Sequence, residues 1–97
     1  MQKTSIQLID GIEVMKFDDG TWIIYGEEKE DSFILNGSAS RALELALQYG
    51  IQEGFKVYLE QVKKEFDDVQ VLRGAEEDYY YILDVCKTKG FVDINTI

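Results

Sequence analysis

Hydrophobic and polar residues alternate in the first third of the chain, which predicts β-structure there. Residues 12–17 alternate apolar and charged side chains, and residues 21–25 form a second apolar segment. Between them, Asp18-Asp19-Gly20 is a strong turn signal. We therefore expect a β-hairpin whose two aspartates make local hydrogen bonds to the backbone, rather than acting in catalysis or cation binding. Trp22 and Ile24 alternate onto one face, which should be buried against the helices.

A third short strand leads directly into a helix. Phe33, Ile34 and Leu35 suit a half-buried sheet surface, and residues 36–38 supply capping side chains and a glycine. An apolar pattern of helical spacing begins immediately afterwards. We expect a strand over residues 32–35 and a first helix over residues 37–49, ended by Gly50.

Two segments around the hairpin are less regular. The apolar positions before the turn signal Asp10-Gly11 leave residues 1–11 open between a strand, a flexible arm and a frayed end. Residues 26–31 carry four carboxylates and one lysine, which is typical of a solvated loop. They lack the alternating oxygen ligands, central glycine and terminal glutamate of a calcium loop, so we expect no metal there.

The second half of the chain shows helical periodicity twice. Residues 53–67 predict a second helix, and residues 75–89 predict a third that begins with acidic residues and ends with lysines, as the helix dipole favours. Residues 67–74 are expected to be a linker or a short extended piece. The second helix should bury Phe55, Tyr58, Leu59, Val62 and Phe66. The third should bury Tyr79, Ile82, Leu83 and Cys86. Gly90 should end the third helix, and Phe91-Val92 should return the chain to the core.

Three consecutive tyrosines in the third helix exceed what one core face can bury. Tyr80 lies on one flank of that face, whereas Tyr81 and Val85 lie toward the other. Tyrosine combines a rigid apolar body with a polar tip and is enriched at binding surfaces. These side chains therefore indicate either an interaction face or a cover for the rim of the domain.

Length and composition restrict the classes of function. Ninety-seven residues are enough for one domain spanning residues 1–97, and the chain has neither a long apolar run nor a secretory signal, so we expect a cytoplasmic protein without a membrane span. The single cysteine, Cys86, excludes an internal disulfide, and the absence of histidine removes the commonest general base. We expect no cofactor and no catalytic activity. The net charge of −9 argues against nucleic acid as a partner.

The order of three strands and three helices predicts an α+β fold of winged helix-turn-helix type, and several residue patterns along it resemble the PqqD family, the peptide chaperones also called RiPP recognition elements. The segment Leu35-Asn36-Gly37-Ser38-Ala39 is similar to the Leu-Asn-x-Thr-Ala run that enters the first helix of that family. Residues 78–92 resemble its third-helix ending, and the resemblance spans residues 13–94. Residues 48–51 depart from it, because the family often carries Asp-Gly before a threonine there.

The resemblance implies a binding module rather than an enzyme. Members of this family bind the leader segment of a ribosomally made precursor peptide and present it to a modifying enzyme, frequently a radical SAM enzyme. A monomer and a homodimer are both compatible with it. Two alternatives are a winged-helix DNA-binding domain, which the acidic third helix disfavours, and a generic protein-interaction subunit.

The expected binding mode is the addition of the leader as an extra, antiparallel strand, as the family pattern implies. Its side chains would enter a groove between the third strand and the third helix. Tyr81 and Val85 are the preferred side chains, with Tyr80 as the alternative if the groove opens on the other flank, and Lys87 and Lys89 could pair with acidic leader residues. The strand residues expected to bind the leader are Asp31, Ser32, Phe33, Ile34 and Leu35.

Overall fold

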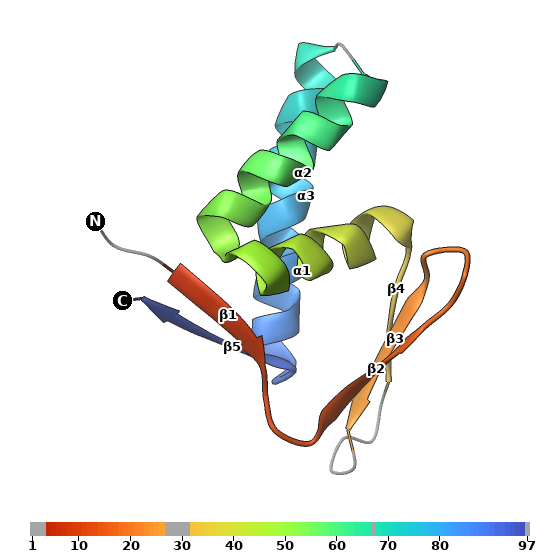
Figure 1. The fold of residues 1–97 in the computed structure, drawn as a ribbon, viewed down its shortest axis with the longest axis vertical. Coiled ribbons are helices and arrows are strands. Elements are labelled where there is room, and N and C mark those ends of the chain that lie inside the picture. The colour runs from red at the N-terminus through yellow and green to blue at the C-terminus, as the bar shows by residue number, and fades with distance from the viewer. Residues whose placement is uncertain (1–3, 27–31, 67, 97) are drawn as a thin grey trace.

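The computed structural model of this chain describes residues 4–26, 32–66 and 68–96 and has an α+β fold. A three-stranded antiparallel sheet precedes three helices, as expected, and a second sheet joins the two ends of the chain (Figure 1). The elements are β1 (Thr4–Leu8), β2 (Ile12–Lys16), β3 (Trp22–Gly26), β4 (Phe33–Leu35), α1 (Gly37–Tyr49), α2 (Ile51–Glu65), α3 (Val69–Thr88) and β5 (Val92–Thr96).

The predicted hairpin is present and β4 extends it into the three-stranded sheet. The strand order is β2-β3-β4, and Met15, Ile23 and Ile34 lie opposite one another in register. Trp22 and Ile24 alternate onto the inner face and are buried, as expected. The acidic loop expected at residues 26–31 lies, beyond Gly26, outside the described residues.

The hairpin turn fixes the position of α1. The Asp19 carboxylate accepts a hydrogen bond from the Thr21 N–H at 2.9 Å, which confirms a local backbone role for this aspartate and lowers its pKa. The hydroxyl of Ser40, a buried polar residue of α1, donates to the Gly20 carbonyl of the turn. This hydrogen bond holds the first turn of α1 against the hairpin. Because α1 follows β4 after one residue, it also positions the end of β4.

The second sheet pairs the two ends of the described chain. Strand β1 lies antiparallel to β5, with Ile6 opposite Ile94. The segment left open between a strand, an arm and a frayed end is therefore a strand over residues 4–8, and β5 is an element that the sequence pattern did not indicate. Ile6 and Val92 are buried, so this sheet closes one end of the core.

Helices α1 and α2 cross closely at a glycine. Asn36 caps α1 by accepting from the Ala39 N–H, and Gly50 ends it at φ 89°. Helix α2 begins at Ile51, two residues earlier than expected. A Cβ atom at Gly54 would lie 2.7 Å from the Leu45 carbonyl oxygen and 2.8 Å from the Tyr79 hydroxyl. Only glycine therefore allows this approach.

Helix α3 is longer than expected. It begins at Val69, where the sequence suggested a linker, and Asp68 caps it by accepting from the Gln70 N–H at 2.8 Å. The prediction of a linker over residues 67–74 was wrong because Gly74 and the β-branched valines lower the local helix propensity, while the N-cap and the packing against α2 outweigh it. Residue 67 lies outside the described residues.

The predicted core face of α3 is largely correct, whereas that of α2 is correct only in part. Phe55 and Val62 are half-buried and pack against the core, and Leu59 is half-buried. Tyr79, Leu83 and Cys86 of α3 are buried together with Tyr58 of α2, whereas Ile82 is half-buried. Phe66 was expected in the core stripe but is 51% exposed, because α2 ends at Glu65 and the chain turns away there. The Tyr79 hydroxyl donates to the Ile51 carbonyl at 2.7 Å, so its polar tip is satisfied inside the core.

Candidate functional site

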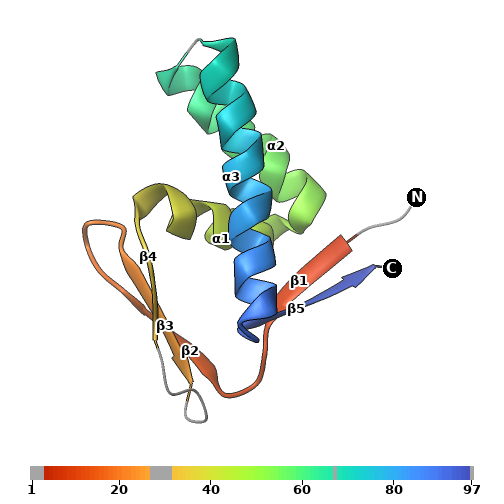
Figure 2. The same ribbon diagram turned by 180° about the vertical axis from the view of Figure 1, so that it is seen from behind.

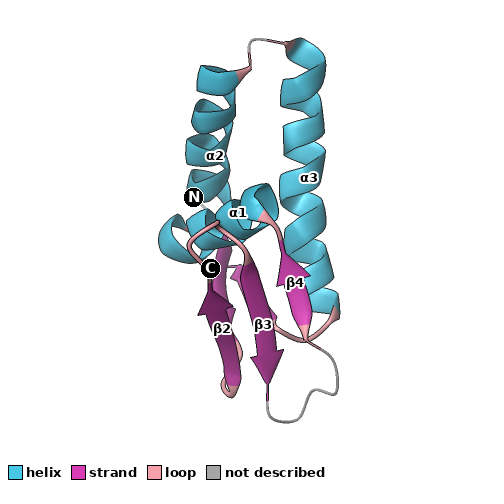
Figure 3. Ribbon diagram, turned by 90° about the vertical axis from the view of Figure 1, so that its right-hand side faces the viewer, coloured by secondary structure: helices cyan, strands magenta, loops and turns pink. Residues whose placement is uncertain are grey.

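Strand β4 has a free edge. It pairs with β3 on one side, and no described strand lies on its other side, which faces α3 (Figure 3). An unpaired edge presents backbone N–H and C=O groups that can bond to another extended chain. The sequence-predicted site therefore falls on an edge strand, although Asp31 lies outside the described residues and Ser32 precedes the strand as an exposed residue.

The three side chains of β4 have different environments. Leu35 is only 1% exposed and belongs to the core, so the backbone is what it can offer to a ligand. Ile34 is 64% exposed and projects from the opposite face of the sheet. Phe33 is half-buried and lies 6.2 Å, between ring centroids, from Phe91, which is in the connection between α3 and β5. Phe33 therefore contacts the chain just after α3.

One flank of α3 faces β4. The Lys89 Nζ lies 5.1 Å from the centroid of the Phe33 ring, a cation–π contact that marks this flank. Helical geometry places Val85 and Tyr81, four and eight residues before Lys89, along the same side. Tyr81 is 66% exposed, so its ring is free to cover a ligand. Of the two flanks left open by the sequence, that of Tyr81 and Val85 is the one beside β4.

Tyr80 and Lys87 lie on the other flank. The Tyr80 ring is 5.4 Å from that of Phe55 in α2 and meets Tyr79 edge to face at 5.2 Å. Burial and the nearby Glu76 carboxylate raise the pKa of Tyr80. Residues seven apart in a helix share a face, so Lys87 lies on the side of Tyr80, which contacts α2. The structure therefore brings neither of these two predicted site residues to β4.

A hollow of about 240 Å³ adjoins the end of β4, where the chain enters α1. Tyr58 lines this hollow and is largely buried, and burial raises the pKa of its hydroxyl. We call this the α1–α3 hollow; its lining comprises Asn36, Ser38, Ala39, Ala42, Tyr58, Asp78, Tyr81 and Ile82.

A larger cleft of about 260 Å³ lies between α2 and the first half of α3. Val71 and Gly74 on one wall belong to the segment that was predicted to be a linker, so this cleft was not predicted from the sequence. The signal that could have found it was an apolar spacing continuing from Val71 through Ala75 into Tyr79.

The described residues hold one cysteine and no cluster of metal ligands. Cys86 is fully buried, which confirms its expected place in the core, and burial raises the pKa of its thiol to about 11. The reactive thiolate is therefore scarce at neutral pH. In residues 4–26, 32–66 and 68–96, no three acidic or cysteine side chains gather closely enough to hold a metal ion. No helix in this part of the chain has the length and apolarity needed to cross a bilayer.

Comparison with known proteins bears on the fold. No protein-family model and no curated protein matches the sequence. A solved structure described as TbiB1 in complex with the TbiA(beta) leader peptide matches with a TM-score of 0.66 and 17% sequence identity, over 90% of this chain and 94% of that chain. At this identity the likeness concerns the fold. It confirms the α+β architecture, and at the level of fold it agrees with the PqqD-like resemblance found in the sequence.

Proposed function

We propose that this protein binds the leader segment of a precursor peptide, which adds as an antiparallel strand to the free edge of β4 and is presented there to a modifying enzyme. The observation that carries the proposal concerns the outer edge of β4. It pairs with no strand among the described residues and lies beside the Tyr81, Val85 and Lys89 flank of α3. The similar fold of TbiB1, whose solved structure contains a leader peptide, supports it. The modifying enzyme that we propose is a radical SAM enzyme, as in the family that the sequence resembles.

Backbone pairing alone is too weak for this role. A net gain of about 0.5 to 1.5 kcal/mol per hydrogen bond gives roughly 2 to 6 kcal/mol for four bonds, whereas micromolar affinity requires about 8 kcal/mol. Side chains must supply the difference and offset the ordering of the peptide. Tyr81 and Val85 present apolar surface on one side of the added strand, and Lys89 presents a positive charge for an acidic leader residue.

Charge disfavours the DNA-binding alternative. Helix α3 carries Glu76, Glu77, Asp78 and Asp84 against Arg73 and Lys87, and the whole chain has a net charge of −9. A helix that enters the major groove needs a positive surface to neutralise phosphates. A peptide ligand is compatible with this acidic surface.

The proposal can be tested with a probe peptide selected from a random displayed library on the immobilised protein. Its affinity is measured by calorimetry for the parent and for three variants: Ile34→Pro, Val85→Asp and Tyr81→Ala. Ile34→Pro alters the backbone of the pairing edge, and the other two change the facing flank of α3. We expect at least a tenfold loss in each, since about 1.4 kcal/mol corresponds to a factor of ten.

Two controls make the test specific. Lys87→Ala changes the flank away from β4 and should bind as tightly as the parent. Circular dichroism verifies that every variant remains folded.

A further test uses the natural ligand. The leader part of a precursor peptide encoded in a neighbouring reading frame should displace the probe. If no peptide is retained, or if all three site variants fold and bind like the parent, the proposed edge is not the site.

A further inference from the structure

We infer that the cleft between α2 and the first half of α3 is a second anchoring site, which takes an apolar side chain, flanked by a basic residue, from the peptide segment that precedes the part paired with β4. We call it the α2–α3 cleft. This inference rests on the proposed function, since the occupant is the same bound peptide.

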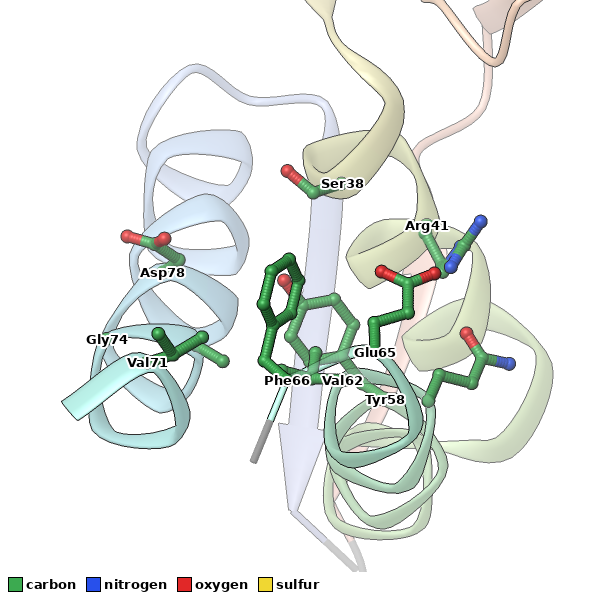
Figure 4. A pocket seen from close by; sticks show the side chains of 11 residues that line it. Ser38, Arg41, Tyr58, Val62, Glu65, Phe66, Val71, Gly74 and Asp78 are labelled. Atoms are coloured by element: carbon green, nitrogen blue, oxygen red, sulfur yellow. The ribbon is translucent and has the colours of Figure 1, made fainter. Parts of the chain in front are cut away.

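The cleft exposes apolar surface that the fold does not use. Phe66 projects between α2 and α3, with Val62 beside it and Val71 on the opposite wall (Figure 4). Phe66 and Val71 are both exposed although each borders a cavity of about 260 Å³. An apolar side chain that entered this space would be covered on two sides, which is the arrangement that anchors a peptide residue.

The cleft continues from the α1–α3 hollow. The two cavities share Ser38, Tyr58 and Asp78 in their linings. Asn36, which follows the last residue of β4, lines the hollow at its other end. A chain leaving the edge of β4 toward α1 therefore passes through the hollow into the cleft without a break in the cavity lining.

Strand direction decides which part of the peptide reaches the cleft. Strand β4 runs toward α1 (Figure 3), so an antiparallel peptide runs away from α1. The residues that lie near α1, and beyond it in the cleft, are therefore those on the N-terminal side of the paired segment.

The polar groups around the cleft select a donor-bearing, basic neighbour for the apolar anchor. The Gln61 Oε1 atom is buried and finds no hydrogen-bond donor among the described residues, so the fold leaves the capacity of this acceptor unused. Glu65 and Asp78 contribute two negative charges to the lining, against one positive charge from Arg41. The remaining charge of −1 favours a lysine or arginine next to the anchor.

Gly74 allows the cleft to be filled without disturbing the fold. A Cβ atom built at Gly74 has nothing within 4 Å, so a side chain added there enters open space. Alanine and leucine are both better helix formers than glycine. Gly74→Leu should therefore occupy the cleft and keep α3 intact, and Gly74→Ala is the matched control that leaves most of the cleft open.

The experiment uses the library-selected probe peptide, its N-terminally truncated form, and the parent, Gly74→Ala, Gly74→Leu and Ile34→Pro proteins. We expect Gly74→Leu to weaken binding of the full probe about tenfold or more, the usual contribution of one apolar side chain in a pocket. Gly74→Ala should bind like the parent. The truncated probe should bind parent and Gly74→Leu equally, because it no longer reaches the cleft.

The outcomes separate this inference from the proposed function. If Ile34→Pro abolishes binding while Gly74→Leu remains folded and binds the full probe like the parent, strand addition holds and the α2–α3 cleft is not an anchor. If Gly74→Leu weakens binding and folded Ile34→Pro does not, the cleft binds peptide without the β4 edge and the proposed strand addition fails. Equal loss of the full and truncated probes in Gly74→Leu also contradicts the inference.

Discussion

The two halves of α3 meet their surroundings differently. In the second half, Tyr79, Leu83 and Cys86 are buried in the core, whereas in the first half Val69 is 72% exposed and Val71 borders an open cleft. Figure 2 shows the reason. The second half of α3 lies among α1, α2 and β5, whereas the first half extends past α1 and β5 and lies beside α2. One continuous helix thus contributes most of its core contacts with the second half, which also carries the exposed Tyr81, and leaves the valines of the first half exposed.

A pair of glycines expresses the same contrast. Gly54 sits where α2 approaches both Leu45 of α1 and the Tyr79 hydroxyl of α3, and a Cβ atom there would overlap them. Gly74, in the first half of α3, has open space around the corresponding position. The identical substitution at these two sites should therefore have opposite effects on stability.

The largest effect is expected for Gly54→Ala. Its methyl group would lie 2.7 Å from a backbone carbonyl oxygen that cannot move alone, so the free energy of unfolding should fall by about 1 to 3 kcal/mol, as in other overpacked cores. Urea denaturation measures the change. Gly74→Ala is the matched control and should raise stability by up to about 1 kcal/mol, because alanine favours the helix. Equal changes in the two variants would show that the two halves do not differ in this way.

A second test truncates the core half at Cys86. Cys86→Ala removes a fully buried sulfur atom and should cost about 1 to 3 kcal/mol of unfolding free energy, while the affinity for the probe peptide remains unchanged. Loss of binding by a folded variant would place Cys86 in the binding surface and contradict the division of the helix.

The same thiol predicts a pH dependence. Burial raises the pKa of Cys86 from an ordinary value of 9.0 to about 11, so the unfolded chain releases the proton first as the pH rises. The contribution of this thiol to the free energy of unfolding is therefore fully present below pH 9.0. It is lost as the pH rises from 9.0 to about 11, by at most about 1.4 kcal/mol per pH unit. Cys86→Val should lose less stability than the parent over this window, which denaturation at a series of pH values can measure.

A smaller effect is expected for Tyr79→Phe. This substitution keeps the ring among Phe55 and Tyr58 but removes the hydroxyl that donates to the Ile51 carbonyl at 2.7 Å. The buried carbonyl loses a partner, so we expect a loss of about 1 kcal/mol in thermal or urea unfolding. An unchanged stability would mean that this hydrogen bond makes no net contribution.

The smallest effect is expected at Val69, in the first turn of α3. Because this side chain is exposed, Val69→Ser should change the free energy of unfolding by no more than about 0.5 kcal/mol. A loss of more than that in urea denaturation would show that the first half of α3 contributes to the core.

The sequence by itself determined the elements that depend on neighbouring residues. The hairpin follows from alternation on both sides of Asp18-Asp19-Gly20, and the junction of β4 with α1 follows from the capping side chain of Asn36. The buried face of Tyr79, Leu83 and Cys86 follows from helical spacing. Such signals act over a few residues, and the chain carries them before it folds.

The tertiary structure alone decided what depends on distant partners. Strands β1 and β5 pair across almost the whole chain, and neither segment is marked strongly enough to reveal the other. The contact of Lys89 with Phe33 selects the flank of α3 that faces β4, which helical spacing left open. The start of α3 at Val69 and the cleft beside Gly74 also depend on how α2 lies against α3. In each case the deciding interaction joins residues far apart in sequence, where local propensity carries no information.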